Sequence, residues 1–138
     1  MLVFLGGPVY SQSEEAQALN RRAIELHRAG KTAEAIPLAK QALELREKSL
    51  PEGHRDIATS LNNLAFLYET QGQRVEAEAL YKRTLAAYEK TLPAGHPDIA
   101  AGLGNLAAFY KEGGRHAEAE VFSKRAQAIE DPEHRPRP

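Results

Sequence analysis

The chain has 138 residues, which is enough for one domain with a buried core, and it contains no cysteine. The lack of cysteine excludes a disulfide framework, a thiolate zinc site and a cysteine nucleophile. Its 18 basic and 19 acidic residues leave a net charge of −1, so no charge excess points to nucleic acid or an acidic membrane surface as a partner.

The first ten residues, MLVFLGGPVY, form an apolar segment before the first helical pattern. They are too few to span a bilayer, which needs roughly 20 apolar residues, and they lack the basic start of a complete signal peptide. Two interpretations stay open: residues 1–12 are a loosely packed lead-in, or residues 1–11 are the remnant of a signal peptide. Val9 and Ser11 offer a small-residue cleavage pattern that favours the remnant. The protein is cytoplasmic in the first case and periplasmic or secreted in the second.

A capping box opens the helical part of the chain. Ser11, followed three residues later by Glu14, predicts a helix over residues 12–28, and Gly30 ends it. A second helix is predicted over residues 32–49, with Thr32 as its N-cap. The first two elements therefore form a helical hairpin.

Two turn-rich connections, LPEGHR at residues 50–55 and LPAGHP at residues 92–97, separate the later helices. Each connection leads into an aspartate, Asp56 or Asp98, which is predicted to cap the next helix by accepting its free backbone N–H groups. The apolar periodicity then predicts four further helices, at about residues 56–71, 74–91, 98–112 and 115–130. The polar, proline-rich residues 131–138 are predicted to be a disordered tail.

These elements recur with a period of 42 residues and without a gap. Adding 42 carries Ile57 to Ile99 and Tyr68 to Tyr110, and subtracting 42 carries Leu61 to Leu19. A fixed period of this length is typical of stacked helical hairpins. The sequence therefore predicts three repeats within residues 13–130, at about residues 14–55, 56–97 and 98–130.

The repeated unit resembles the tetratricopeptide repeat, and its spacing is similar to the longer variant found in kinesin light chains. The residues that carry this resemblance in the second copy are Leu64, Ala65, Tyr68, Gly72, Ala77, Tyr81 and Thr84. The first copy departs most, because Arg22 and Ala39 stand where the second copy has a leucine and a tyrosine. The resemblance implies an all-α fold, a right-handed α-solenoid of three helix-turn-helix repeats.

In such a solenoid the first helix of each hairpin faces the concave side, where a ligand is expected. Asn63 and Asn105 recur one period apart, and a carboxamide can both donate to and accept from a peptide backbone. Since asparagines at this position line the peptide groove of kinesin light chains, the resemblance implies that these two contact a bound peptide. The alternative is that they form hydrogen bonds between neighbouring hairpins.

Phe66 has Ala108 at the matching position one period later, which predicts an apolar pocket; the alternative is ordinary packing between repeats. Selectivity is expected from Phe66, Arg21 and Arg28. The predicted groove residues in full are Asn20, Arg21, Ile24, Arg28, Asn62, Asn63, Phe66, Asn105 and Ala108.

Other chemistry has simpler explanations. No two of the five histidines share a helical face at ligand spacing, so no metal site is predicted. Without a nucleophile motif or a phosphate-binding glycine loop, no enzyme activity and no cofactor are predicted. The basic pairs at residues 82–83 and 124–125 lie among glutamates, which predicts ion pairs rather than nucleic-acid binding. Four glutamates are predicted to be exposed in the first turns of their helices: Glu76, Glu78, Glu118 and Glu120.

The sequence thus predicts a protein-interaction module that binds a peptide segment of a partner in its concave groove, with no nucleic-acid or membrane partner. The alternative is a structural or self-associating repeat unit, or a fragment of a longer repeat scaffold. This alternative arises because the helix at residues 115–130 is predicted to lack the polar cap with which natural arrays usually end. Self-association would then use Val121, Ala128 and Ile129, which are predicted to be partly uncovered.

Overall fold

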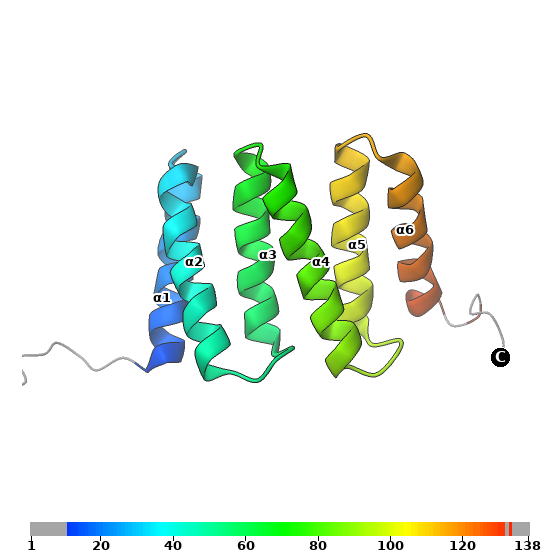
Figure 1. Cartoon of the computed structure of the whole chain (residues 1–138), viewed down its shortest axis with the longest axis horizontal. Coiled ribbons are helices and arrows are strands. Elements are labelled where there is room, and N and C mark those ends of the chain that lie inside the picture. Colours follow the sequence, from blue (N-terminus) through cyan, green and yellow to red (C-terminus); the bar gives the residue numbers. More distant parts are fainter. Residues whose placement is uncertain (1–10, 132, 134–138) are drawn as a thin grey trace, which may run out of the picture.

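The computed structural model describes residues 11–131 and 133. In this part the chain forms six α-helices, arranged as three antiparallel hairpins that stack in chain order (Figure 1). The helices are α1 (Gln12–Arg28), α2 (Thr32–Ser49), α3 (Arg55–Thr70), α4 (Arg74–Thr91), α5 (Pro97–Glu112) and α6 (His116–Glu130). The predicted all-α solenoid of three hairpins is confirmed. The signal-peptide interpretation and most of the predicted tail fall outside the described residues.

The helix ends agree with the prediction to within one residue, but one cap differs in the first hairpin. Ser11 and Glu14 form the expected capping box. The N-cap of α2 is Lys31, and no side chain caps this helix, so the predicted Thr32 cap is wrong. Thr32 is the first helical residue, and its hydroxyl instead forms a 3.0 Å hydrogen bond with Nδ1 of His27 in α1.

Histidine caps the helices that open the second and third hairpins. Nδ1 of His54 accepts a 3.0 Å hydrogen bond from the backbone N–H of Asp56, and Nδ1 of His96 accepts one of the same length from Asp98. The prediction that the aspartates are the caps is therefore wrong. Both aspartates lie in the first turn, where their charge still opposes the positive end of the helix. An imidazole nitrogen can replace the usual carboxylate because the cap needs one acceptor lone pair.

Each hairpin turns at a glycine in the left-handed backbone region, as at Gly72, where φ is +77°. There the N–H of Gly72 donates to the Glu69 carbonyl at 2.9 Å, and the N–H of Gln73 donates to the Tyr68 carbonyl at 2.8 Å. These bonds satisfy carbonyls at the end of α3 that have no helical partner. Because a side chain is disfavoured in this conformation, glycine recurs here in each copy.

The stacked hairpins form a row, and its hydrophobic core consists of two apolar clusters. Tyr68 and Leu80 pack against both clusters. One cluster joins the first hairpin to α3, and the other joins the second and third hairpins. Within the second hairpin, Ala65 and Ala77 are both fully buried, at 0% exposure. Small side chains at these positions allow α3 and α4 to approach closely.

The first helices lie on the concave side of the row. Within the described residues, the backbones of α1 and α3 lie close together, whereas α2 and α4 meet only through long side chains, as in the 2.6 Å ion pair between Glu47 and Arg83. Because α1 and α3 are closer together than α2 and α4, the row curves toward its first helices. Side chains of α1, α3 and α5 that point away from their partner helices therefore face the inner surface.

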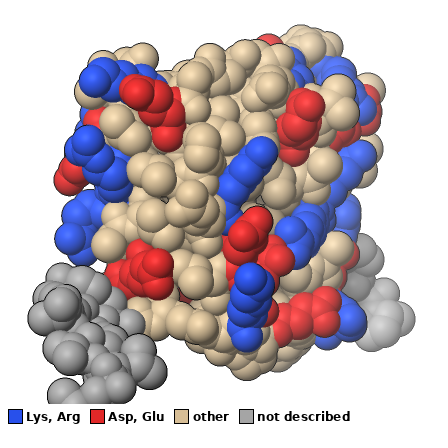
Figure 2. All heavy atoms as spheres, turned by 60° about the vertical axis from the view of Figure 1, so that its left-hand side comes forward, with Lys and Arg blue, Asp and Glu red and all other residues tan. Residues whose placement is uncertain are grey.

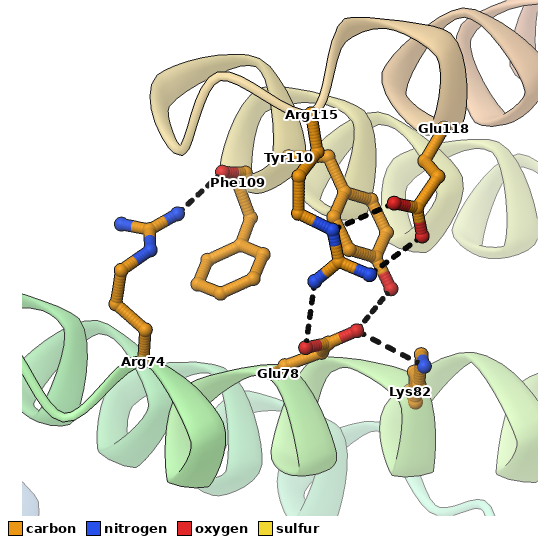
Figure 3. A network of polar contacts seen from close by, with 7 residues as sticks. All are labelled: Arg74, Glu78, Lys82, Phe109, Tyr110, Arg115 and Glu118. Carbon is orange, nitrogen blue, oxygen red and sulfur yellow. Dashed lines mark hydrogen bonds and ion pairs between the residues drawn. The ribbon is translucent and has the colours of Figure 1, made fainter.

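A polar network links the second hairpin to the third at the edge of the core (Figure 3). The Glu78 carboxylate accepts hydrogen bonds from the Tyr110 hydroxyl at 2.6 Å and from the Arg115 guanidinium at 2.9 Å, and it lies 3.0 Å from the Lys82 amine. These donors, the Tyr110 hydroxyl foremost, hold the pKa of the Glu78 carboxyl at about 2. The prediction that Glu78 is exposed is wrong, because α5 stacks over it and leaves its side chain 20% exposed.

The basic residue pairs form the predicted ion pairs. Lys82 and Lys124 each pair with a glutamate one turn earlier in the same helix, at 3.0 Å. The neighbouring arginines reach the preceding hairpin: Arg83 pairs with Glu47 and Arg125 pairs with Glu89, both at 2.6 Å. The same link therefore recurs at both junctions between hairpins.

Candidate functional site

The concave side holds a pocket of about 270 Å³ between α1 and α3. Helical spacing explains its composition, since residues three, four, seven and eight positions apart lie on one face. The side chains of α1 that line it occupy positions 20, 23, 24, 27 and 28, and those of α3 occupy positions 63, 66 and 67. The lining residues are Asn20, Ala23, Ile24, His27, Arg28, Asn63, Phe66 and Leu67.

Five of the nine predicted groove residues line this pocket, namely Asn20, Ile24, Arg28, Asn63 and Phe66. The sequence prediction missed Ala23, His27 and Leu67. Helical periodicity could have predicted two of these residues from the sequence, because Ala23 and His27 lie on the same face of α1 as the predicted residues. The pocket is therefore a contiguous surface built from two first helices.

The outer part of the pocket is apolar. Phe66 is 50% exposed and Ile24 is 39% exposed, which is unusual for large apolar side chains in this chain. The His27 ring lies edge-on to the Phe66 ring, with centroids 5.1 Å apart, and its hydrogen bond to Thr32 holds it there. A ligand side chain placed against this wall would bury apolar surface that water now covers.

Asn20 lies at the inner wall of the pocket, and it is only 7% exposed. Its Nδ2 donates to the Ser60 hydroxyl at 3.1 Å, and the same oxygen accepts from Arg46 at 3.0 Å. Arg46 also donates to the Asp56 carbonyl at 2.9 Å. Asn20 thus lines the predicted groove, and its side chain also belongs to a buried polar cluster between the first two hairpins.

One atom of this cluster has no partner. The Oδ1 atom of Asn20 is shielded from solvent and forms no hydrogen bond with the described residues. Leaving a buried carbonyl oxygen unpaired costs about 1 to 3 kcal/mol, so such atoms are rare in folded proteins.

The other four predicted residues lie outside this pocket. Arg21 and Asn105 are exposed, and Asn62 is half-buried. Ala108 lines a separate hollow between α5 and α6. The structure thus brings Asn63 and Phe66 together with α1, and it does not bring Asn105 and Ala108 to the same pocket.

Charges are interspersed on the side that carries the first hairpin. In Figure 2, basic and acidic side chains lie close to one another there, with uncharged surface between them. Among the described residues, neither Arg21 nor Arg28 forms an ion pair with a carboxylate, whereas Arg22 pairs with Glu25 at 3.3 Å. The pocket therefore has one uncompensated cation, Arg28, in its lining.

The last helix carries polar residues where α4 carries large apolar ones. Tyr81, Leu85 and Tyr88 of α4 are buried in the cluster shared with α5. The residues one period later are Ser123, Gln127 and Glu130. The face of α6 that corresponds to the stacking face of α4 is therefore polar at these three positions. As predicted, Val121 is 57% exposed and Ala128 and Ile129 are partly buried.

The described part of the chain offers neither a cluster of metal ligands nor a membrane-spanning helix. No three or more His, Cys, Asp or Glu side chains in residues 11–131 and 133 are grouped so that they could hold a metal ion. None of the six described helices is both long enough and apolar enough to cross a membrane.

The chain matches a family model described as tetratricopeptide repeat over residues 14–90 and again over residues 56–131. Among solved structures, it is similar to a protein of Podosopora anserina described as a kinesin light chain with nearly identical TPR-like repeats. That match has 28% identity and a TM-score of 0.75, and covers 88% of this chain and 57% of the other. No curated protein matches the chain significantly.

Two further structures show the same fold at lower identity. BtubC (BKLC) from P. vanneervenii is 24% identical with a TM-score of 0.76, covering 92% of this chain and 52% of that one. The TPR domain of Arabidopsis FLU is 21% identical with a TM-score of 0.69, covering 86% of this chain and 96% of that domain. The chain thus spans little more than half of the first two structures and nearly all of the third.

Proposed function

The chain belongs to the tetratricopeptide repeat family, and from this premise we propose that it is a protein-binding module whose concave groove holds an extended segment of a partner protein. Repeats of this family mediate protein–protein interactions and are typically non-enzymatic scaffolds. The choice of the concave groove rests on the side chains that α1, α3 and α5 present there.

The pocket between α1 and α3 carries this proposal. It combines an exposed aromatic wall at Phe66 with carboxamides at Asn20 and Asn63. An extended peptide needs both kinds of contact, because its side chains require pockets and its backbone requires donors and acceptors. Asn105, exposed one period after Asn63, is positioned to continue backbone contacts along α5.

The alternative function, self-association through α6, has weaker support. Val121 is exposed and offers some apolar surface. However, Gln127 and Glu130 stand where α4 presents Leu85 and Tyr88 to the next hairpin, so stacking on this face would bury polar groups. The groove is therefore the better-supported site.

Selection from a displayed peptide library tests the proposal. The wild type is compared with an Asn63→Ala/Asn105→Ala variant, in which the half-buried carboxamide of Asn63 and the exposed one of Asn105 are removed. A Val75→Ala/Val121→Ala variant is the matched control, because these residues lie on second helices and are 79% and 57% exposed. Helicity and thermal unfolding of all three proteins are measured first.

We expect peptides that are enriched on the wild type and the control but lost on the asparagine variant. The same peptides retained by all three proteins, or no enrichment on any of them, would rule out the groove. The solution mass of the wild type and of the Val75→Ala/Val121→Ala variant would then test self-association, since loss of a dimer in that variant would implicate the second helices.

A further inference from the structure

We propose that the concave groove selects an extended segment that carries an acidic side chain and a basic side chain, with the acid over α1 and the base over α5. This inference rests on the proposed function, because it names the charge pattern of the partner segment. The charges that carry it differ from one copy of the repeat to the next, so they are a property of this chain and not of the repeat.

One position at the edge of the inner surface changes charge along the row. Arg28 of α1 corresponds to Thr70 of α3 and to Glu112 of α5, at intervals of 42 residues. Each of the three is the final residue of its helix and is exposed. Thr70 donates its hydroxyl to the Phe66 carbonyl of its own helix at 2.9 Å, and it adds no charge. The row therefore runs from a cation through a neutral residue to an anion.

The cationic end lies at the pocket between α1 and α3, which Arg28 lines. Arg21 lies seven residues earlier, on the same face of α1. Neither arginine forms an ion pair with a carboxylate among the described residues. The positions that match Arg21 in the later copies hold Asn63 and Asn105, which are neutral. An acidic side chain of a ligand can therefore pair with a cation of α1 without displacing an existing partner.

The anionic end lies where α3 and α5 end. Glu112 forms no ion pair with a basic side chain in the described part of the chain, and it neighbours the carboxyl of Glu69, whose side chain is 16% exposed. Burial, and then the neighbouring Glu112, raise the pKa of Glu69. Arg74 lies 3.8 Å from Glu69, and the Tyr81 hydroxyl donates to Glu69 at 3.1 Å. The charge of Glu112 is thus left for a cation of the ligand.

The spacing of the helices determines the spacing of the two charges in the ligand. Packed neighbouring helices lie roughly 8 to 10 Å apart, so α1 and α5 are separated by roughly 16 to 20 Å across α3. An extended chain rises about 3.3 Å per residue, so side chains about five or six residues apart reach both ends. The exposed ring of Phe66 lies between the ends, where an apolar side chain of the segment can pack.

Four short peptides test this charge pattern. They share a central leucine among glycines and serines, and they differ at two residues about six positions apart. These two residues are one glutamate and one lysine, two glutamates, two lysines, or two glutamines. Each peptide is titrated into the full chain at low salt, and the backbone amide resonances are followed by NMR.

The peptide with one glutamate and one lysine should bind the wild type about two- to fivefold more tightly than either peptide with two like charges, since each exposed ion pair contributes modestly. Its resonance shifts should include both ends of the groove, at Arg28 and at Glu112. The preference should disappear at about 1 M salt, which screens charges more than about 3 Å apart.

Charge reversal at either end should change which peptide binds most tightly. Arg28→Glu makes both ends acidic and should favour the peptide with two lysines, whereas Glu112→Arg should favour the peptide with two glutamates. Lys48→Glu and Glu130→Arg are the matched controls. They make the same charge changes at exposed residues in the last turns of second helices, so the order of the peptides should stay as in the wild type. Thermal unfolding checks that each variant is folded.

Equal binding of the mixed peptide and the peptide with two glutamates to the wild type would overturn the proposal, because Glu112 would then not act on the ligand. Equal binding of the mixed peptide and the peptide with two lysines would overturn it at Arg28. A control variant that altered the order as its groove counterpart does would show that net charge alone is responsible. In these three cases the groove still binds peptides and the proposed function stands, whereas an absence of shifts on α1, α3 and α5 with every peptide would defeat both.

Discussion

The two junctions between hairpins occupy equivalent places in the repeat, and both contain apolar clusters, yet two matching positions in them carry different chemistry. Between the first and second hairpins, Arg46, Ser60 and Asn20 form a buried polar cluster. Between the second and third hairpins, Tyr88 stands at the position of Arg46 and Gly102 at the position of Ser60, in an aromatic core. The repeat therefore preserves where side chains meet rather than how they interact.

This difference in side chains explains why the pocket between α1 and α3 lies at the first junction. At the second junction, aromatic rings pack between hairpins: Tyr81 of α4 lies 5.5 Å from Phe109 of α5 between ring centroids, and Phe109 in turn lies 5.6 Å from Tyr110. At the first junction, small and polar side chains leave Asn20 incompletely paired beside an opening to the concave side. Apolar packing between hairpins holds the array together, whereas the polar cluster at the first junction leaves one buried amide oxygen without a partner among the described residues.

The largest effect is expected from removing an aromatic ring at the second junction. Tyr110 is 1% exposed and contacts both neighbouring rings, so Tyr110→Ala should destabilise the protein by about 3 to 5 kcal/mol through lost burial and a cavity. Urea unfolding measures the change. Tyr110→Phe is the matched control and should lose only the hydroxyl bond to Glu78, about 1 kcal/mol. A cost for Tyr110→Ala as small as that of the control would contradict the importance of the aromatic core.

The next effect is expected at the polar junction. Arg46→Ala removes the hydrogen bonds to the Asp56 carbonyl and to Ser60, and it should cost about 2 to 3 kcal/mol. A double variant, Arg46→Tyr with Ser60→Gly, tests the difference between the two junctions directly. It gives the first junction the residue pair that the second junction has at positions 88 and 102.

The double variant should be at least about 1 kcal/mol more stable than the sum of its single changes predicts, since glycine makes room for the ring. Urea unfolding of both single variants and the double variant supplies this coupling. Additive costs would show that the two junctions differ in more than these two side chains.

A smaller effect, with a defined pH dependence, is expected at Glu78. Because its pKa lies at about 2 rather than the ordinary 4.5, the folded state favours the ionised carboxylate. The resulting stability is present above pH 4.5 and is lost as the pH falls toward 2. Glu78→Gln should therefore destabilise the protein by about 1 to 2 kcal/mol at pH 7, and the difference from wild type should disappear near pH 2.

Glu120 is the matched control for this measurement, because it stands one period after Glu78 and, among the described residues, its carboxylate pairs with Lys124 alone. Its side chain is 65% exposed, so Glu120→Gln should change the stability by less than about 0.5 kcal/mol. Equal losses in the two variants, or a loss at Glu78 that persists at pH 2, would show that the network in Figure 3 does not act through the charge of Glu78.

The sequence period predicted the helices because apolar spacing and turn glycines are local signals that recur in register. It predicted five pocket residues because helical spacing also determines which side chains share a face. It did not predict the burial of Asn20 or the network at Glu78. Both depend on the side chains that the next hairpin brings, Ser60 in one case and Tyr110 in the other. Pairing between hairpins is a tertiary property, and the repeat pattern alone does not encode it.

The caps provide the smallest expected effect, and they test whether the junctions differ only in their cores. His54 and His96 accept the same hydrogen bond at the same distance, 3.0 Å, at the start of α3 and α5. His54→Ala and His96→Ala should each cost about 1 kcal/mol, because each leaves one N–H at the helix start without its acceptor. His54→Asn should retain most of the stability, since asparagine is a favourable N-cap. Urea unfolding should give equal losses in the free energy of unfolding for the two alanine variants. Losses that differ by more than about 0.5 kcal/mol would mean that the side chains at each junction also affect the stability of the helix cap in its connecting loop.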